Sequence, residues 1–309
     1  MNVSGIPKGL VTFGRGLGQS PHMDFNDGKK ETLMMQMRAS RVLAKLRAGG
    51  AALTFKMNLA DARAAEIAAM CGCDCLWLDQ EHVANDYRVL EACIWAAKSR
   101  DVDVMVRVPR GSYSDHVRPL ELDAAGIMVP HVMSLADAQA VVRMTRFHPV
   151  GRRPVDGGNA DGAYCEVDFC DYLRQANEQR FVVVQIEDPE PLAELDAIAA
   201  LPGIDVIFFG PGDFSHAIGA PGEWNHPRLL AARQRVLEAA LAHGKVAGTV
   251  SGPGNVKELL DMGFRFLNLG ADVVGLAEYC KSMAAAFCAV TVPAPVAGTA
   301  SNSSLYGGK

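Results

Sequence analysis

Carboxylates follow two apolar stretches of the sequence, each at the point where a buried strand would end. Residues 181–184 are apolar and lead to Glu187, and a second apolar run at 206–209 leads to Asp213. Continuous apolar runs are typical of parallel strands buried on both faces, and α/β enzymes carry their chemistry at the carboxyl ends of such strands. Paired carboxylates suit Mg²⁺ or Mn²⁺, which keep open positions for substrate oxygens. We expect Glu187 and Asp213 to hold one divalent cation; solvated loop acids are the alternative.

Other polar residues stand at the ends of further apolar runs. His82 follows Asp79 by three residues, so the aspartate can orient the imidazole and support its basicity; a histidine that bonds only to backbone is the alternative. Arg107 lies inside an apolar run, where a guanidinium requires an anion from the substrate or a structural salt bridge. The strand-end residues expected to converge are Asp79, Glu81, His82, Arg107, His131, Gln185, Glu187, Asp213 and Ser215.

Two further features lie at the ends of expected strands, where the polar residues above are expected to converge. The segment 210–213 reads Gly-Pro-Gly-Asp, and Gly212 allows a ligand to approach backbone N–H groups. A substrate carboxylate can bind there; a plain tight turn is the alternative. Lys56 ends the first expected strand and is a minor candidate for a Schiff-base amine.

Strand and helix patterns alternate along the chain and must position these residues. Eight alternations predict a (β/α)₈ TIM barrel. A doubly wound open sheet is the alternative, but it favours a glycine-rich loop after the first strand, and residues 55–58 (Phe-Lys-Met-Asn) are not one. The strands are expected at 51–55, 75–79, 104–108, 126–130, 181–187, 205–210, 246–250 and 265–270.

The whole chain divides into a flexible arm at 1–28, a barrel domain at 29–290 and a low-complexity tail at 291–309. Helical composition predicts a helix at 29–48, an N-terminal extension of the barrel. The segment 147–170 is rich in Gly and Pro, which is typical of a functional or mobile loop. Helices are expected between the strands at 61–70, 87–98, 113–122, 134–145, 171–179, 191–200, 227–243, 256–262 and 273–288.

Composition excludes several classes of function. The 309 residues are 49% hydrophobic and carry a net charge of −5, and lysines and arginines are spread singly, so we expect no nucleic-acid partner. No apolar stretch approaches the roughly 18 residues of a membrane-spanning helix, and the first residues lack the apolar core of a signal peptide. Eight cysteines without secretory signals predict a reducing, cytoplasmic environment.

Three of these cysteines are clustered at 71, 73 and 75. Their spacing does not fit zinc, which favours pairs separated by two to four residues. We expect small buried residues at a turn from helix to strand.

Five segments, in this order, resemble successive motifs of the HpcH/HpaI family of class II pyruvate aldolases, which includes 2-oxo-3-deoxy acid aldolases and macrophomate synthase. The resemblance covers about residues 40–285 and implies a (β/α)₈ barrel, a divalent cation (Mg²⁺, or Mn²⁺ or Co²⁺) and a pyruvate enolate. The segments are 79–82 (Asp-Gln-Glu-His), 106–109 (Val-Arg-Val-Pro), 126–130 (Gly-Ile-Met-Val-Pro), 185–187 (Gln-Ile-Glu) and 210–215 (Gly-Pro-Gly-Asp-Phe-Ser).

The resemblance also implies a role for each matching residue. Glu187 and Asp213 correspond to the metal ligands. His82 corresponds to a base that acts through water, with Asp79 as its orienting partner, and Arg107 to the residue that steadies the enolate oxygen. The expected substrate-binding residues are Gln185, Gly212, Asp213 and Ser215.

The implied activity is cleavage or formation of 4-hydroxy-2-oxo acids, with a small 2-oxo acid and an aldehyde as partners. Oxaloacetate decarboxylation through the same enolate is the alternative. A barrel without catalytic activity is a third interpretation, and the presence of all the matching site residues argues against it. Family members form hexamers with an exchanged C-terminal helix, so a homo-oligomer is expected. Residues 273–288 are the candidate for that helix; ordinary packing against the barrel is the alternative and fits their apolar character equally well.

The sequence departs from the family pattern in two places. Gln80 stands where the family has glycine, which adds a side chain near the expected mouth. The segment 156–162 (Asp-Gly-Gly-Asn-Ala-Asp-Gly) replaces an Ala/Arg-rich run after 151–154. We expect this divergent loop to choose the aldehyde.

Overall fold

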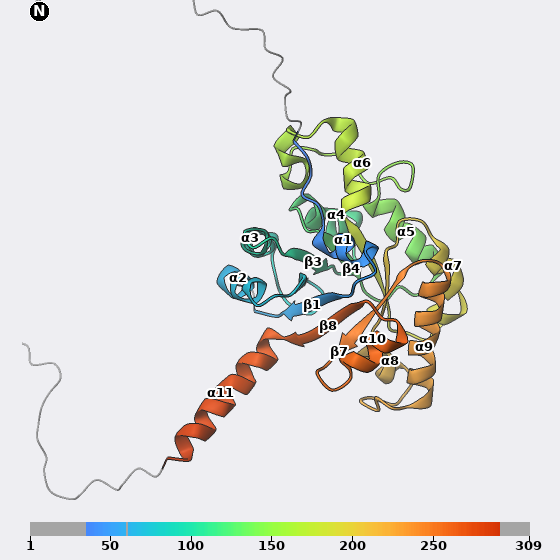
Figure 1. The fold of residues 1–309 in the computed structure, drawn as a ribbon. Helices are drawn as coiled ribbons and strands as arrows, with labels where there is room; N and C mark the ends of the chain where they lie inside the picture. Colours follow the sequence, from blue (N-terminus) through green and yellow to red (C-terminus); the bar gives the residue numbers. More distant parts are fainter. Residues whose placement is uncertain (1–34, 60, 291–309) are drawn as a thin grey trace, which may run out of the picture. The chain divides into compact units, whose positions relative to one another are not determined.

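Eight parallel strands form a closed barrel in chain order, with β8 paired to β1 (Figure 1). The computed structural model describes residues 35–59 and 61–290, so the predicted arm at 1–28 and tail at 291–309 lie outside the described residues. The predicted (β/α)₈ barrel is confirmed, and the doubly wound sheet is excluded because the strands close. The strands are β1 (Ala52–Met57), β2 (Cys75–Asp79), β3 (Asp103–Arg107), β4 (Gly126–Val129), β5 (Phe181–Ile186), β6 (Val206–Phe209), β7 (Val246–Ser251) and β8 (Phe266–Ala271).

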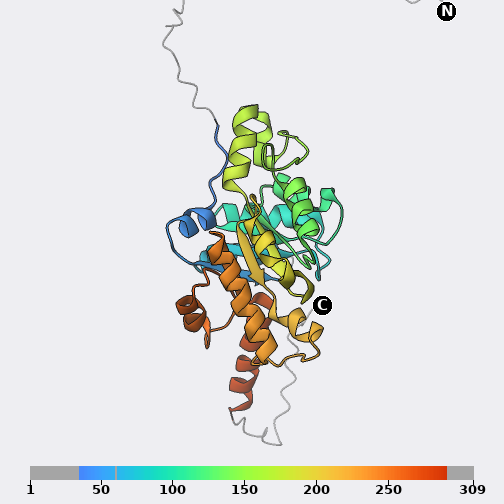
Figure 2. The ribbon, with the colours of Figure 1, turned by 90° about the vertical axis from the view of Figure 1, so that its right-hand side faces the viewer.

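Helices that connect consecutive strands lie around this barrel, while the first helix precedes β1 and the last follows β8 (Figures 1 and 2). Among the described residues they are α1 (Arg41–Arg47), α2 (Ala62–Met70), α3 (Tyr87–Lys98), α4 (Tyr113–Glu121), α5 (Leu135–Thr145), α6 (Phe169–Gln179), α7 (Leu195–Ala200), α8 (Pro211–Ala217), α9 (Pro227–Ala242), α10 (Val256–Met262) and α11 (Asp272–Cys288), with 3₁₀ helices η1 (Ala160–Cys165) and η2 (Glu190–Ala193).

Three helical segments differ from expectation, and one of them is the helix predicted at 191–200, which is divided into η2 and α7. The described part of the predicted helix at 29–48 is helical only over Arg41–Arg47, because Ser40 is extended and caps it by accepting a hydrogen bond from Leu43 N. Helix α8 was not predicted; it has seven residues and opens with Pro211 directly after β6.

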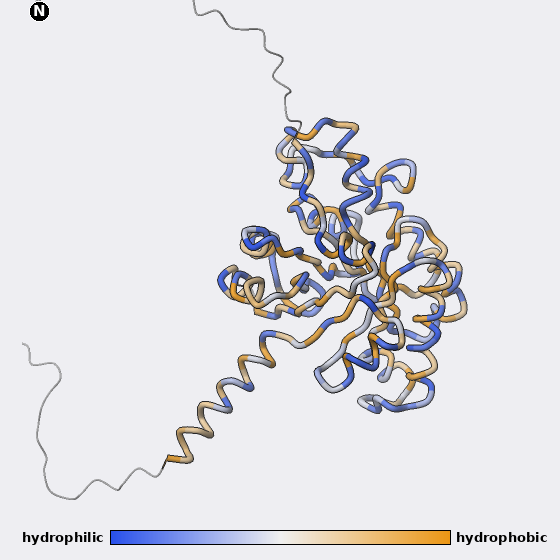
Figure 3. Tube along the Cα trace, in the orientation of Figure 1, coloured by the Kyte–Doolittle hydropathy of each residue, from blue (hydrophilic) through white to orange (hydrophobic). Residues whose placement is uncertain are grey.

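The apolar residues form two layers, one on each side of the strands. Alternate residues of each strand point inward, where Trp77, Phe208 and Phe266 belong to one buried cluster. The residues between them, such as Leu76 and Val184, pack outward against the helices. Figure 3 shows hydrophobic colour along the tube through the strands and also along α11. The period of two fixes which side chains face the barrel axis.

The amino end of the barrel is closed by α1, whose Val42 and Leu43 join the inner cluster. Buried Asp103, at the start of β3, accepts hydrogen bonds from Ser40 Oγ (2.6 Å) and Val42 N (2.9 Å) and holds α1 in place. This closure leaves the carboxyl ends of the strands as the open mouth.

Helix α11 leaves the end of β8, and none of its side chains is buried. No helix within the described part of the chain has the length and apolar character needed to cross a membrane.

Candidate active site

The strand alternation carries three predicted residues to the inner side of the mouth. Asp79 follows inward Trp77 by two residues, and Arg107 follows inward Met105 in the same way. Gln185 likewise follows inward Val183. The sequence pattern that buries the barrel interior therefore also aims these polar groups at its axis.

Asp79 and Arg107 face each other because β2 and β3 pair in a register that aligns them. Arg107 Nε donates to Asp79 Oδ1 (3.0 Å) and Nη2 donates to Oδ2 (2.5 Å). Lys56 Nζ lies 3.0 Å from the same carboxylate. Burial acts to raise the pKa of Asp79, but the hydrogen bonds and charge of Arg107, and then Lys56, lower it to about 2.

Arg107 is fixed in orientation, but its contacts with neighbouring side chains do not use all of its N–H groups. Its two bonds to Asp79 use two of five N–H groups. Nη1 lies 2.9 Å from Glu81 Oε2. Arg107 and Lys56 both lie over the Trp77 ring, 5.0 and 5.4 Å from its centroid. The remaining N–H groups of Arg107 are available to an anion in the cavity.

Across the mouth, Glu187 is only 1% exposed. Its Oε1 accepts from His131 N (2.9 Å), and its Oε2 accepts from Gln185 Nε2. Burial raises the pKa of Glu187 to about 7, opposed by His131 and reinforced by the charges of Asp213 and Glu81. Carboxylates that repel one another in a buried site are a donor set suited to a cation.

A second observation supports a cation here. Ligand atoms of Glu81, His131 and Glu187 lie within 4.8 Å of one another, which makes these residues a candidate metal group. His131 has a left-handed backbone (φ 47°) and its Nδ1 lies 2.8 Å from Asp188 Oδ2. Asp213, in the first turn of α8, is not one of these three residues; it lines the adjoining cavity, and its charge acts on Glu187.

Gly210 lets the β6–α8 turn lie against these groups. A Cβ atom at this position would stand 2.7 Å from Glu187 Oε2 and 2.8 Å from Gln185 Nε2. Any larger residue would therefore displace the carboxylate or the backbone that carries Asp213.

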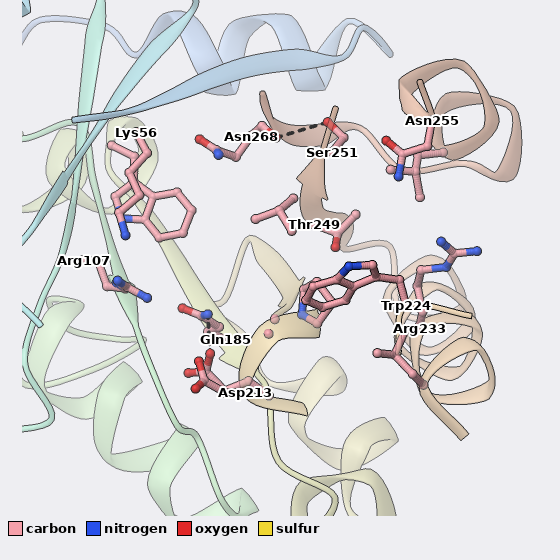
Figure 4. A pocket seen from close by; sticks show the side chains of 18 of the residues that line it. Lys56, Arg107, Gln185, Asp213, Trp224, Arg233, Thr249, Ser251, Asn255 and Asn268 are labelled. Atoms are coloured by element: carbon pink, nitrogen blue, oxygen red, sulfur yellow. Dashed lines mark hydrogen bonds between the residues drawn. The ribbon is translucent and has the colours of Figure 1, made fainter. Parts of the chain in front are cut away.

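These groups open into a cavity of about 650 Å³ at the carboxyl end of the barrel. Figure 4 shows Lys56 and Arg107 on one side, Gln185 and Asp213 below them, and Trp224 and Arg233 on the opposite side. The size falls within the range of roughly 300–1,000 Å³ typical of small-molecule sites. Its lining includes the predicted residues His82, Arg107, Gln185, Glu187, Gly212 and Asp213.

Three of the predicted residues are not arranged as expected. The predicted contact between Asp79 and His82 is absent, because Asp79 is occupied by Arg107 and Lys56. The His82 side chain is 58% exposed, and its Nε2 lies 3.5 Å from Glu81 Oε2. Ser215 does not line the cavity; its Oγ donates to Gly212 O (2.7 Å) and accepts from Gly222 N (3.2 Å).

The two divergent segments also lie elsewhere. Gln80 does not line the cavity; its Nε2 donates to Asn85 O (3.0 Å), which shapes the loop after β2. The segment 151–162 is held by the buried pair of Arg153 and Asp161 (2.8 Å), and it contributes no residue to the lining of this chain's cavity. Within one chain, this loop therefore does not line the cavity in which it was expected to select the aldehyde.

Sequence reasoning missed residues on both sides of the cavity. Trp77 was recoverable, because it shares the inward face of β2 with Asp79. Trp224, Arg233 and Asn255 gave no local signal, since the packing of α9 and α10 on the barrel decides what reaches the cavity. Among the clustered cysteines, Cys73 and Cys75 are buried as expected, but Cys71 is exposed.

Comparison with known proteins gives consistent findings. A family model described as HpcH/HpaI aldolase/citrate lyase matches residues 54–278. The hydroxypyruvate/pyruvate aldolase of Pseudomonas aeruginosa is 35% identical over 274 residues, 88% of this chain and 100% of that protein. The 4-hydroxy-2-oxovalerate aldolase of Rhodococcus jostii (strain RHA1) is 34% identical over 260 residues, 83% and 99% of the two chains. The crystal structure of an aldolase from Desulfitobacterium hafniense DCB-2 matches with a TM-score of 0.78 and 27% identity, over 83% of this chain and all of that one.

Proposed function

Because the chain belongs to the HpcH/HpaI aldolase/citrate lyase family and is a carbon–carbon lyase, we propose that it is a divalent-metal-dependent aldolase. Its substrates are 4-hydroxy-2-oxo acids, and cleavage gives pyruvate and an aldehyde. The observation that carries this proposal is the meeting of a buried carboxylate, Glu187, with the fixed guanidinium of Arg107 in one cavity. Relatives named as hydroxypyruvate/pyruvate and 4-hydroxy-2-oxovalerate aldolases support it.

Glu187 and Asp213 would hold the cation, with Gln185 beside it. Mg²⁺ is the proposed metal, with Mn²⁺ or Co²⁺ as substitutes, because oxygen ligands dominate the site. When bound, the cation supplies positive charge that polarises the 2-oxo group and stabilises the enolate. The backbone of Gly212 and Asp213 would receive the substrate carboxylate.

Arg107 stabilises the charge that appears during cleavage. The C4 hydroxyl loses its proton, the C3–C4 bond breaks, and its electron pair becomes the enolate of pyruvate as the aldehyde leaves. The free N–H groups of Arg107 donate to the enolate oxygen, an interaction that is strongest in the transition state. Asp79 keeps the guanidinium in place through two hydrogen bonds.

His82 is the proposed base, acting through water. Its imidazole is exposed at the mouth and lies beside Glu81 rather than Asp79. A water between His82 and the C4 hydroxyl would carry the proton, and protonation of C3 then gives pyruvate. Asp79 therefore orients Arg107, and Glu81, rather than Asp79, is the carboxylate beside His82.

The test is turnover by metal-free and reloaded enzyme. Purified protein is treated with chelator and offered pyruvate with a panel of aldehydes, with product masses read by mass spectrometry. Activity should vanish and return with Mg²⁺, Mn²⁺ or Co²⁺. Full activity after exhaustive chelation would rule out metal dependence.

A second arm tests the shared enolate. Oxaloacetate loses CO₂ to give the same enolate, so Glu187→Gln should abolish both aldol cleavage and decarboxylation. If only one of the two activities falls, the two reactions do not share this site.

We also propose that the enzyme is a homo-oligomer, with a hexamer expected from the family. Seven apolar residues at and just after α11 are solvent-exposed in the single chain: Val273, Val274, Leu276, Tyr279, Met283, Phe287 and Val290. A helix with this surface is typical of an intersubunit contact.

A further inference from the structure

One side of the active-site cavity has no role in the chemistry proposed above. It lies opposite Lys56 and Arg107 and is formed by the loop before α9, by α9 itself and by the β7–α10 loop (Figure 4). Trp224, Arg233 and Asn255 lie there, and we call these three residues the distal subsite. The acidic residues in the cavity lining, Glu187 and Asp213, are not part of the distal subsite, and Glu258, the carboxylate that pairs with Arg233, does not line the cavity.

Arg233 has donor capacity that the fold does not use. Its side chain is 19% exposed and makes one ion pair, from Nη2 to Glu258 Oε1 at 3.2 Å. Its Nε is buried and has no hydrogen-bond partner among the described residues. A buried donor without a partner is unfavourable unless a ligand or water completes it.

The neighbours of Arg233 add donors and exclude water. Asn255 Oδ1 accepts from Gly252 N (2.8 Å), which leaves the amide NH₂ group without a hydrogen bond among the described residues. Leu229 and Leu259 line the cavity beside it, and both are buried. Low solvent access strengthens the attraction between a guanidinium and an anion.

A second arginine on the same helix provides the contrast. Arg235 Nη1 and Nη2 both bond to Asp196, away from the cavity. Arg235 is therefore satisfied within the protein, whereas Arg233 lines the cavity and has one exposed partner, Glu258.

We propose that the distal subsite binds an anionic group at the far end of the acceptor aldehyde. This inference rests on the proposed aldolase function and names the class of aldehyde. The reacting carbonyl lies near Arg107 and the metal ligands, and the anion lies against Arg233 and Asn255. A carboxylate and a phosphate offer the same chemistry to a guanidinium, so both are tested.

The experiment compares kcat/KM for aldol addition of pyruvate to four aldehydes. Succinic semialdehyde and glyceraldehyde 3-phosphate carry the anion; butanal and glyceraldehyde are their neutral counterparts. Arg233→Met should lower kcat/KM about 10- to 100-fold for an anionic acceptor, the loss expected for a charge-assisted hydrogen bond. It should leave neutral acceptors and oxaloacetate decarboxylation unchanged, and the acceptor that suffers the larger loss identifies carboxylate or phosphate.

Two variants separate this role from a structural one. Arg235→Met removes the same charge from the same helix and should change none of the rates. Glu258→Gln removes the ion pair between α9 and α10 and should retain the preference for the anion. Equal loss on neutral and anionic acceptors, or the same loss in Glu258→Gln, would overturn the distal subsite.

Failure of the proposed function gives a different result. In that case the wild-type enzyme converts neither the neutral aldehydes nor oxaloacetate. Calorimetric titration of the metal-loaded protein with sulfate needs no turnover, so it tests anion binding at the distal subsite even in that case. Sulfate should bind more weakly to Arg233→Met than to Arg235→Met, and equal affinity would refute it.

Discussion

Arg107 is held in one orientation before any substrate arrives. Two bonds to Asp79 and the face of Trp77 fix its guanidinium, which is buried. Such fixed donors stabilise developing charge without reorganising. The cost of burying this guanidinium is offset by the carboxylates of Asp79 and Glu81.

Replacing Arg107 should therefore affect the chemical step more than binding. We expect Arg107→Ala to lower kcat by roughly 10²–10³, the loss typical of one transition-state donor. Steady-state kinetics with a cleavable 4-hydroxy-2-oxo acid measures the effect, and circular dichroism checks that the barrel is intact. A near-wild-type kcat would return Arg107 to a purely structural role.

Gly210 gives a prediction about the metal ligands. In Gly210→Ala the new Cβ would stand within 2.8 Å of both Glu187 and Gln185, so metal affinity and activity should fall together. Gly212→Ala is the matched control, since its Cβ meets no atom within 4 Å. That variant should bind Mn²⁺ normally in a calorimetric titration and show a raised KM for pyruvate. Unchanged metal affinity in Gly210→Ala would contradict the packing argument.

At the level of elements, α4 contains a buried histidine that links stability to pH. His116 is 3% exposed, and its Nδ1 lies 2.9 Å from Ser112 O. Burial lowers the pKa of His116, against the opposing effects of Ser112 and Asp115. The neutral form is thus favoured in the folded state, so stability is present above the unfolded pKa of about 6.5 and falls as pH decreases below it.

The free energy of unfolding should therefore fall between pH 7.5 and 5.5, and His116→Asn should reduce that fall. Asparagine keeps a donor near the position of Nδ1 but cannot be protonated. Urea unfolding of both proteins at the two pH values measures the difference. Equal pH dependence in wild type and variant would show that His116 does not contribute.

All eight strands were predictable because apolar runs between turns depend on local sequence. The convergence of Arg107, Gln185 and Glu187 on one rim followed from the parallel order alone. The pairing of Asp79 was not predictable from spacing. Register on the neighbouring strand places Arg107 directly opposite it, and a buried ion pair outweighs a contact with an exposed histidine three residues away.

Other features depend on tertiary packing. Helix α8 was missed because Pro211 and Gly212 read as a turn, although proline is favourable at a first helical position. The pattern of α9 shows which face is apolar, but not which of its arginines reaches the cavity. That depends on how α9 lies against its neighbours: α10, whose Glu258 pairs with Arg233, and α7, whose Asp196 pairs with Arg235.

In the whole molecule, the two ends of the barrel are used differently. The amino end is closed by α1 and by buried ion pairs such as that of Arg180 with Asp123. The opposite charges of this pair compensate each other within the chain, although Arg180 Nε has no hydrogen-bond partner among the described residues. The carboxyl end has a buried Arg233 Nε without a hydrogen-bond partner among the described residues and a carboxylate of raised pKa at Glu187. The proposed substrate and cation would supply partners for these two groups at the carboxyl end.

The surface of α11 predicts how the whole molecule assembles. An apolar groove of about 800 Å³ runs between β1, α2 and the first turns of α11, and its lining includes Phe55 and Ile67. Farther along α11, Met283 and Phe287 are 49% and 73% exposed, and their spacing of four places them on one side of the helix. Apolar surface of this extent favours burial against another copy of the chain.

We expect Met283→Glu combined with Phe287→Glu to yield a smaller species than wild type, because two charges would be buried in the contact. Light scattering coupled to size exclusion measures the mass, and six chains of 33.0 kDa would give about 198 kDa. Lys281→Glu is the control, since it also adds a negative charge to α11 but lies two residues from Met283, on another side of the helix. A wild-type mass of one chain would reject the oligomer. A wild-type-like mass for the double variant would show that α11 is not the contact.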